Sequence, residues 1–108
     1  MFQRKQYVAM RDGVKLYTVV WLPKEKSACP ALLKRSPYMQ PNNYDDRPES
    51  EQFVTVIQST RGTGLSEGDF IPFWNERNDG LDTLDWIRRQ DFYNGRIYIE
   101  GESYLSAA

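Results

Sequence analysis

The sequence predicts an α/β fold, in which a sheet of about five strands begins antiparallel, continues parallel and carries one main helix. Three observations predict it. Two β-branched and aromatic runs at the N-terminus flank an Asp-Gly pair, which is typical of a hairpin. Two further short apolar runs lie far apart in the sequence, as strands joined by crossover connections do. One helical pattern then separates these runs from a last strand that ends at a Gly-x-Ser sequence.

The first two strands are predicted at residues 2–9 and 14–22. The second is rich in Val, Tyr, Thr and Trp, which favour strands, and it ends before Pro23. Asp12 and Gly13 lie between the two runs, and both residue types tolerate a positive φ. We therefore expect an antiparallel hairpin at the start of the sheet.

Two strands of the kind that is covered on both faces are predicted next, at residues 31–34 and 53–58. A polar, loop-like stretch at residues 39–51 separates them, and its acidic side chains are expected to be solvated. The main helix is predicted at residues 75–90, and the last strand at residues 96–100.

Apolar residues recur at intervals of three in this helix and predict its buried stripe. They are Leu81, Leu84 and Ile87, with Trp86 beside them. The helix also carries three carboxylates that could be read as metal ligands, Asp79, Asp82 and Asp85. The helix dipole and surface ion pairs, such as that of Asp85 with Arg88 or Arg89, explain them better. We therefore expect no metal site.

A glycine-rich turn follows the strand at residues 53–58, with glycines at 62, 64 and 68. A dinucleotide-binding loop would need a helix directly after these glycines, so that the helix N-terminus could hold the pyrophosphate. Residues 69–74 are instead aromatic and contain a proline, and the glycine spacing is off by one. We therefore expect no nucleotide and no other cofactor.

Composition and charge indicate a soluble globular protein. The chain has 40% hydrophobic residues, 27% charged residues and a formal net charge of −1. This nearly neutral charge gives no electrostatic reason to expect nucleic acid or an anionic membrane as partner. The apolar runs are too short to span a membrane, and the N-terminus lacks the apolar segment of a signal peptide, so we expect a cytoplasmic protein. The single cysteine, Cys29, excludes an internal disulfide and cannot build a metal site.

The last strand leads to a candidate nucleophile, Ser103. A strand, a sharp turn with Gly101 two residues before the serine, and small residues after it are the pattern of a nucleophile elbow. Leu105 stands where a second small residue is usual, and on its own a Gly-x-Ser sequence is most often an ordinary turn. A serine also needs a base, commonly an imidazole, to take its proton, and the sequence contains no histidine.

Five motifs, in this order, resemble the N-terminal part of the cocaine-esterase-like and X-prolyl dipeptidyl peptidase group (CocE/NonD, peptidase S15) of α/β-hydrolases. They are residues 10–16 (MRDGVKL), 35–38 (RSPY), 58–62 with 66–70 (QSTRG and SEGDF), 79–87 (DGLDTLDWI) and 101–105 (GESYL). Where the group commonly has aspartate and glycine, this chain has Ser59 and Ser106. The resemblance implies that residues 1–108 are the N-terminal portion of one α/β-hydrolase domain, with an incomplete sheet.

The resemblance also implies a set of site residues. Ser103 aligns with the nucleophile, the hydroxyl of Tyr38 with one donor of the oxyanion hole, and the backbone N–H of Tyr104 with the other. Two donors aimed at the developing oxyanion are what acyl transfer requires. Members of the group carry the acid and the histidine of the triad in several hundred further residues.

We therefore expect a serine hydrolase of the CocE/X-Pro dipeptidyl-peptidase type. Its intact form would cleave an ester or amide bond of a small ester, amide or peptide substrate through an acyl-serine intermediate. The chain alone lacks the triad acid and histidine, so we expect it to be inactive. The alternative is a non-catalytic remnant that folds or functions only with another chain, through self-association or pairing with a missing C-terminal half, because the last strand would otherwise keep an open edge.

Overall fold

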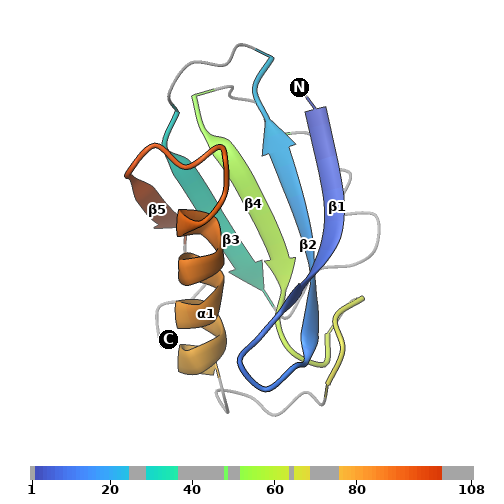
Figure 1. Ribbon diagram of the computed structural model, residues 1–108. Coiled ribbons are helices and arrows are strands. Elements are labelled where there is room, and N and C mark those ends of the chain that lie inside the picture. The colour runs from blue at the N-terminus through green and yellow to red at the C-terminus, as the bar shows by residue number, and fades with distance from the viewer. Residues whose placement is uncertain are drawn as a thin grey trace.

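A five-stranded mixed sheet with one helix packed on it forms the part of the chain that the structure describes (Figure 1). The structure is a computed structural model, and it describes residues 2–24, 29–36, 48, 52–63, 65–68 and 76–100. The strand order in the sheet is β1-β2-β4-β3-β5. The elements are β1 (Phe2–Ala9), β2 (Lys15–Leu22), β3 (Ala31–Ser36), β4 (Val54–Ser59), α1 (Glu76–Arg88) and β5 (Ile97–Glu100).

The sheet begins antiparallel and continues parallel, as the sequence predicts. β1 pairs with β2, and β2 with β4, in antiparallel register. β3 then lies between β4 and β5 and is parallel to both. Because parallel strands end at the same edge of a sheet, the carboxyl ends of β3, β4 and β5 all reach one edge, where open α/β sheets bind their ligands.

The predicted hairpin turn joins β1 to β2. The backbone N–H of Met10 donates to the carbonyl of Val14 (2.8 Å), and the N–H of Gly13 donates to the carbonyl of Met10 (2.9 Å). Gly13 has a φ of 88°, in the left-handed region that an Asp-Gly turn needs. β2 begins at Lys15, one residue later than predicted.

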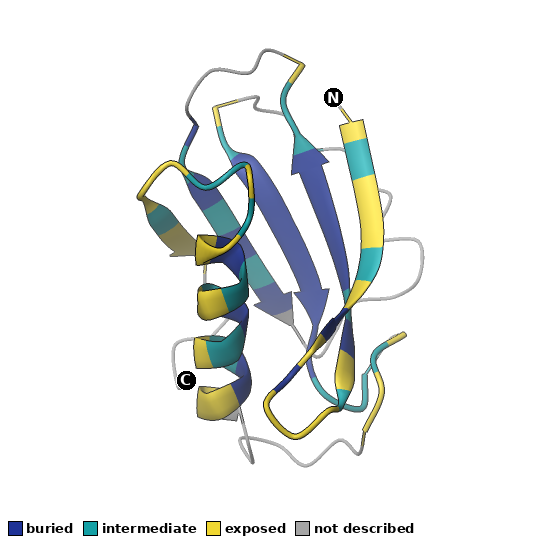
Figure 2. Ribbon diagram, in the orientation of Figure 1, coloured by how far each residue is buried: buried dark blue, intermediate teal, exposed yellow. Residues whose placement is uncertain are grey.

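The apolar core lies between α1 and one face of the sheet. Figure 2 shows the central strands almost entirely buried, whereas β1 is mostly exposed. The largest cluster of buried apolar residues has contributions from three strands, the helix and Cys29; its members are Val20, Cys29, Ala31, Leu33, Val54, Val56 and Ile87. The opposite face of the sheet has a smaller cluster, formed by Val19, Trp21 and Ile57. Among the described residues, no helix is long and apolar enough to cross a membrane.

The buried face of α1 differs from the predicted stripe. Ile87 is fully buried and Leu84 is partly buried against the core, but Leu81 is 46% exposed. Asp79, Thr83 and Ile87 are the buried residues instead, and a spacing of four places them on one side of a helix. The buried face of α1 therefore carries two polar residues, Asp79 and Thr83, whereas the pattern predicted leucines there.

This assignment of the helix faces predicts unequal effects of two truncations. Ile87→Ala should lower the free energy of unfolding by about 2–4 kcal/mol, because it empties a fully buried site. Leu81→Ala is the matched control on the same helix, and its exposed side chain should change stability by less than about 1 kcal/mol. Urea unfolding followed by circular dichroism measures both. A larger loss for Leu81→Ala would contradict the orientation of α1.

Candidate active site

The candidate site lies at the sheet edge where the three parallel strands end. The predicted site residues Tyr38, Ser103 and Tyr104 fall outside the described residues, so their placement stays a prediction. Tyr38 follows the last residue of β3 by two positions, and Ser103 follows the last residue of β5 by three. β3 and β5 are hydrogen-bonded neighbours, with Leu33 beside Ile99. The segments that carry Tyr38 and Ser103 therefore start from adjacent strands at one edge.

The core under α1 changes from apolar to polar as it approaches this edge. On β3 the inward-facing residues are Leu33 and then Arg35, and on β4 they are Val56 and then Gln58. Arg35 is only 1% exposed, and Gln58 is fully buried. A buried polar side chain is stable only where its hydrogen bonds are made, so the contacts of these residues decide how the edge is held.

Gln58 connects four elements through side-chain hydrogen bonds. The Nε of Arg35 donates to its Oε1 (2.7 Å), and its own Nε2 donates to the Oγ1 of Thr18 on β2 (3.0 Å). The Thr83 hydroxyl of α1 lies 2.9 Å from the same Oε1. Sequence patterns alone did not predict this group. The signal for it was the polar residues inside runs that otherwise predict buried strands, Thr18 in β2, Arg35 in β3 and Gln58 in β4.

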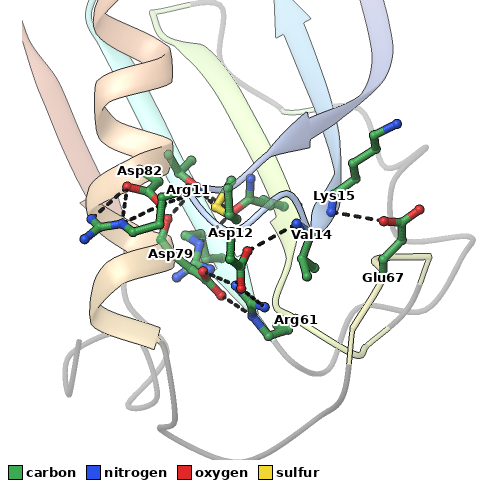
Figure 3. A network of polar contacts seen from close by, with 12 residues as sticks. Arg11, Asp12, Val14, Lys15, Arg61, Glu67, Asp79 and Asp82 are labelled. Carbon is green, nitrogen blue, oxygen red and sulfur yellow. Dashed lines mark hydrogen bonds and ion pairs between the residues drawn. The ribbon is translucent and has the colours of Figure 1, made fainter.

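Arg61 links the turn after β4 to the β1–β2 hairpin and to α1 (Figure 3). Its guanidinium contacts Asp79 through two hydrogen bonds (2.9 and 2.7 Å) and Asp12 through two more (2.7 and 3.2 Å). The Arg61 hydrogen bond holds the pKa of the Asp12 carboxyl below its usual value, and the two carboxylates raise the pKa of Arg61. Both carboxylates that pair with Arg61 come from other elements, Asp12 from the hairpin turn and Asp79 from α1.

The glycine-rich turn is shaped by Arg61 and is anchored to β2. Gly68 has a φ of 89°, and a Cβ added there would lie 2.7 Å from the Cγ of Arg61, so only glycine fits. Ser66 accepts a hydrogen bond from the N–H of Tyr17 (2.8 Å), and the N–H of Glu67 donates to the carbonyl of Lys15 (2.9 Å). These contacts hold the described part of the turn against β2.

The helix carboxylates form ion pairs, and two of the three pair across the fold. Asp82 accepts from the Nη2 of Arg11 (2.8 Å) and from its backbone N–H (2.9 Å), which lowers the pKa of Asp82. Asp85 pairs with Arg88 at 3.1 Å on the surface, as predicted. Asp79, by contrast, is 1% exposed, so the expectation of surface pairing was wrong for it. Its buried position near the sheet was not visible in the helix pattern alone.

A family model matches most of the chain. The model described as X-Pro dipeptidyl-peptidase (S15 family) matches residues 12–108. Among curated proteins, the cocaine esterase of Rhodococcus sp. (strain MB1 Bresler) is 36% identical over 106 residues. That match covers 91% of this chain and 18% of the esterase.

Solved structures share the fold of this chain. An α-amino acid ester hydrolase is 29% identical with a TM-score of 0.79, over 93% of this chain and 21% of its own. An aminopeptidase from a marine sediment Thaumarchaeota archaeon is 27% identical with a TM-score of 0.81, and the match covers 98% of this chain and 22% of the aminopeptidase. A CocE/NonD family hydrolase from Staphylococcus aureus is 25% identical with a TM-score of 0.76, and the match covers 97% of this chain and 23% of the hydrolase. The chain thus spans about a fifth of the length of these relatives.

The buried position of Asp79 predicts a large cost when its charge is removed. Asp79→Asn should lower the free energy of unfolding by roughly 3 kcal/mol, because it leaves Arg61 with one carboxylate instead of two. Asp85→Asn removes an exposed pair on the same helix and should cost less than about 0.5 kcal/mol. Urea unfolding at neutral pH compares the two variants. Equal costs would contradict the role given to the Arg61–Asp79 pair.

The lowered pKa values of Asp12 and Asp82 predict a loss of stability in acid. In the unfolded chain an aspartate titrates near pKa ~3.9, so each group stabilises the fold above that pH. This contribution is lost as the pH falls through the unfolded and then the folded pKa. The urea concentration at the unfolding midpoint should therefore decrease when the pH is lowered below about 4. This decrease with pH should be less steep in the double variant Asp12→Asn/Asp82→Asn. An equally steep decrease in the variant and in the parent chain would contradict these pKa shifts.

Proposed function

Because the chain belongs to the X-Pro dipeptidyl-peptidase (S15) family of α/β-hydrolases, as its motifs predict, we propose that it is the N-terminal part of a serine hydrolase. The intact enzyme would cleave an ester or amide bond through an acyl-serine intermediate. The similar proteins include a cocaine esterase, an amino acid ester hydrolase and an aminopeptidase, so the substrate class is a small ester, amide or peptide.

The observation that carries this proposal is the position of β5. β5 is parallel to β3, with Lys34 beside Glu100, and Gly101-Glu102-Ser103 comes directly after it. A nucleophile elbow requires a strand that delivers its serine at the carboxyl edge of the sheet. The order of the strands provides such a strand in the described part of the chain, and we assign the nucleophile to Ser103.

The neighbouring strand supports the oxyanion assignment. Attack of the Ser103 hydroxyl on a carbonyl carbon creates a tetrahedral oxyanion, which needs preorganised donors. Tyr38 follows β3, the direct neighbour of β5, and its hydroxyl would be one donor. The backbone N–H of Tyr104 would be the other. Collapse of this intermediate would expel the alcohol or amine and leave an acyl-serine, which water then hydrolyses.

The proton acceptor for this chemistry has to come from outside these 108 residues. They contain no histidine, and a serine hydroxyl is a weak nucleophile without a base. The relatives carry about four-fifths of their length beyond the matched part. We therefore infer that the chain alone is inactive and that the triad acid and histidine are supplied by further hydrolase sequence, either linked to it or paired with it.

A non-catalytic role by association is the second candidate, and the exposed side chains of β5 favour it. Tyr98 is 50% exposed and Ile99 is 55% exposed, on a strand that pairs with β3 alone within the described sheet. Such a strand can be covered by a second copy of the chain or by another polypeptide. Sedimentation of the chain distinguishes the candidates. A folded monomer with cooperative unfolding would contradict a protein that folds only by association.

A chimeric enzyme tests the hydrolase proposal. The chain replaces the aligned segment of the Rhodococcus cocaine esterase, whose remaining sequence then supplies the other parts of the site. The chimera should hydrolyse a p-nitrophenyl ester, and Ser103→Ala should reduce kcat by about 10⁴-fold or more, because the nucleophile is lost.

Two controls accompany this test. Ser106→Ala removes a serine of the same motif region and should retain most of the activity, since no catalytic role is assigned to it. The isolated 108-residue chain should show no Ser103-dependent turnover. Turnover by the chimera that persists in the Ser103→Ala variant would refute the assignment of the nucleophile.

A further inference from the structure

Arg35 is the largest of the fully buried side chains in the described part of the chain. A buried charge destabilises a fold by several kcal/mol unless its surroundings compensate it, and an apolar residue of similar size would avoid that cost. The neighbouring Lys34 points to the other face of β3, where it remains half-exposed and pairs with Glu100 at 3.1 Å. A cation at position 35 therefore calls for a role beyond filling space.

The guanidinium of Arg35 ties the end of β3 to the rest of the fold. Arg35 is the residue before the last of β3, and it stands directly opposite Gln58 in the register with β4. Its Nε donates to Gln58 Oε1 at 2.7 Å, and Gln58 is held in turn by Thr18 of β2 and Thr83 of α1. The Nη1 of Arg35 also lies 3.6 Å from the point where a Cβ at Gly80 would stand. Because Gly80 has no side chain, the guanidinium lies beside the backbone of α1 at this position.

We propose that Arg35, which donates to Gln58 in a hydrogen-bonded group that includes Thr83, is a positioning residue that fixes the carboxyl end of β3 and thereby the place of Tyr38. This inference rests on the proposed function, in which Tyr38 donates to the oxyanion. Tyr38 follows Arg35 by three positions in the sequence, and one of the two residues between them is Pro37, whose ring restricts φ. An oxyanion donor misplaced by about 1 Å can lower the rate by roughly 100-fold, so the strand end has to be held firmly.

The geometry of an arginine suits this role better than that of a lysine. A guanidinium is a planar fork with five N–H donors in fixed directions, whereas an ammonium is a point charge on a flexible stem. The Nε contact with Gln58 uses one of these directions, and Nη1 lies beside the helix backbone at Gly80. Arg35→Lys keeps the charge and removes this geometry, which makes it the informative substitution.

The test measures turnover by the chimera described above, which contains the whole chain. Arg35→Lys should lower kcat about 10-fold and leave KM unchanged within about 2-fold, because the donor is needed in the transition state. Thr83→Val removes the hydroxyl that lies 2.9 Å from Gln58 Oε1 and 2.8 Å from the carbonyl of Asp79, and it should lower kcat about 3-fold. Lys34→Met is the matched control on the opposite face of β3 and should leave kcat unchanged. Thr83→Val also serves as the milder variant if Arg35→Lys impairs folding.

A double-mutant cycle separates positioning from a merely structural role. Tyr38→Phe alone should lower kcat by roughly 100-fold, because one oxyanion donor is lost. In this background Arg35→Lys should cost less than about 2-fold, since the hydroxyl that Arg35 positions is already absent. A structural role would cost the same factor in both backgrounds, and that additive result would overturn the proposal.

Hydrogen–deuterium exchange of the isolated chain gives a reading that does not depend on activity. Arg35→Lys should speed exchange of the peptide that contains residues 36–40 at least about 3-fold, while the β1–β2 hairpin stays unchanged. Equal exchange in that peptide for Arg35→Lys and for the parent chain would overturn the proposal. If the chimera lacks Ser103-dependent turnover while the isolated chain still shows the local increase in exchange, the result counts against the proposed function alone.

Discussion

The ion pair of Arg61 with Asp79 is the interaction on which the described structure depends most. It joins the turn after β4 to the first half of α1, and through Asp12 it also reaches the β1–β2 hairpin. The guanidinium of Arg61 thus holds two segments that lie 18 and 49 residues away from it in the sequence. Because Asp79 is almost fully buried, its charge is stable there only while Arg61 is in place. The close approach of Gly68 to Arg61 belongs to the same arrangement.

Between α1 and the sheet, the core has an apolar zone and a polar zone with different tasks. The apolar zone, with Leu33, Val56 and Ile87, provides the burial that stabilises any packed helix and sheet. The polar zone lies toward the carboxyl ends of the parallel strands and is connected by hydrogen bonds around Gln58. Directional contacts of this kind contribute little net stability, but they allow fewer arrangements than apolar packing does. That property suits the edge from which catalytic residues of this family would extend.

The position of β5 connects the fold to the function that we propose. Within the described sheet β5 pairs with β3 on one side only, and it leads directly into the sequence that carries Ser103. By the function that we propose, this chain would provide the nucleophile, the strand that presents it and the oxyanion donors. The chain spans about a fifth of the length of its relatives, so under this proposal the proton-transfer groups of the triad would come from sequence outside the matched part. Hydrolysis would then require that both parts meet at the same sheet edge.

The sequence by itself determined the local elements and their order. The Asp12-Gly13 turn, both kinds of strand and the helix follow from short-range patterns, because backbone preferences and hydrophobic periodicity act over a few residues. The five ordered motifs are also sufficient to indicate the family, because they are a property of the sequence and need no tertiary contact. The candidate site could be predicted only as positions in the chain, since Tyr38 and Ser103 were placed by resemblance to the family.

Only the tertiary structure decided which face of α1 is buried and where its carboxylates find partners. Leu81 fits the apolar periodicity and is nevertheless exposed, while Asp79 is polar and buried, because Arg61 is available 18 residues earlier in the sequence. The same holds for Arg35, which is buried opposite Gln58 of the neighbouring strand and donates to its Oε1. A charge can be buried only beside a partner, and partners that are distant in sequence come together only in the folded chain.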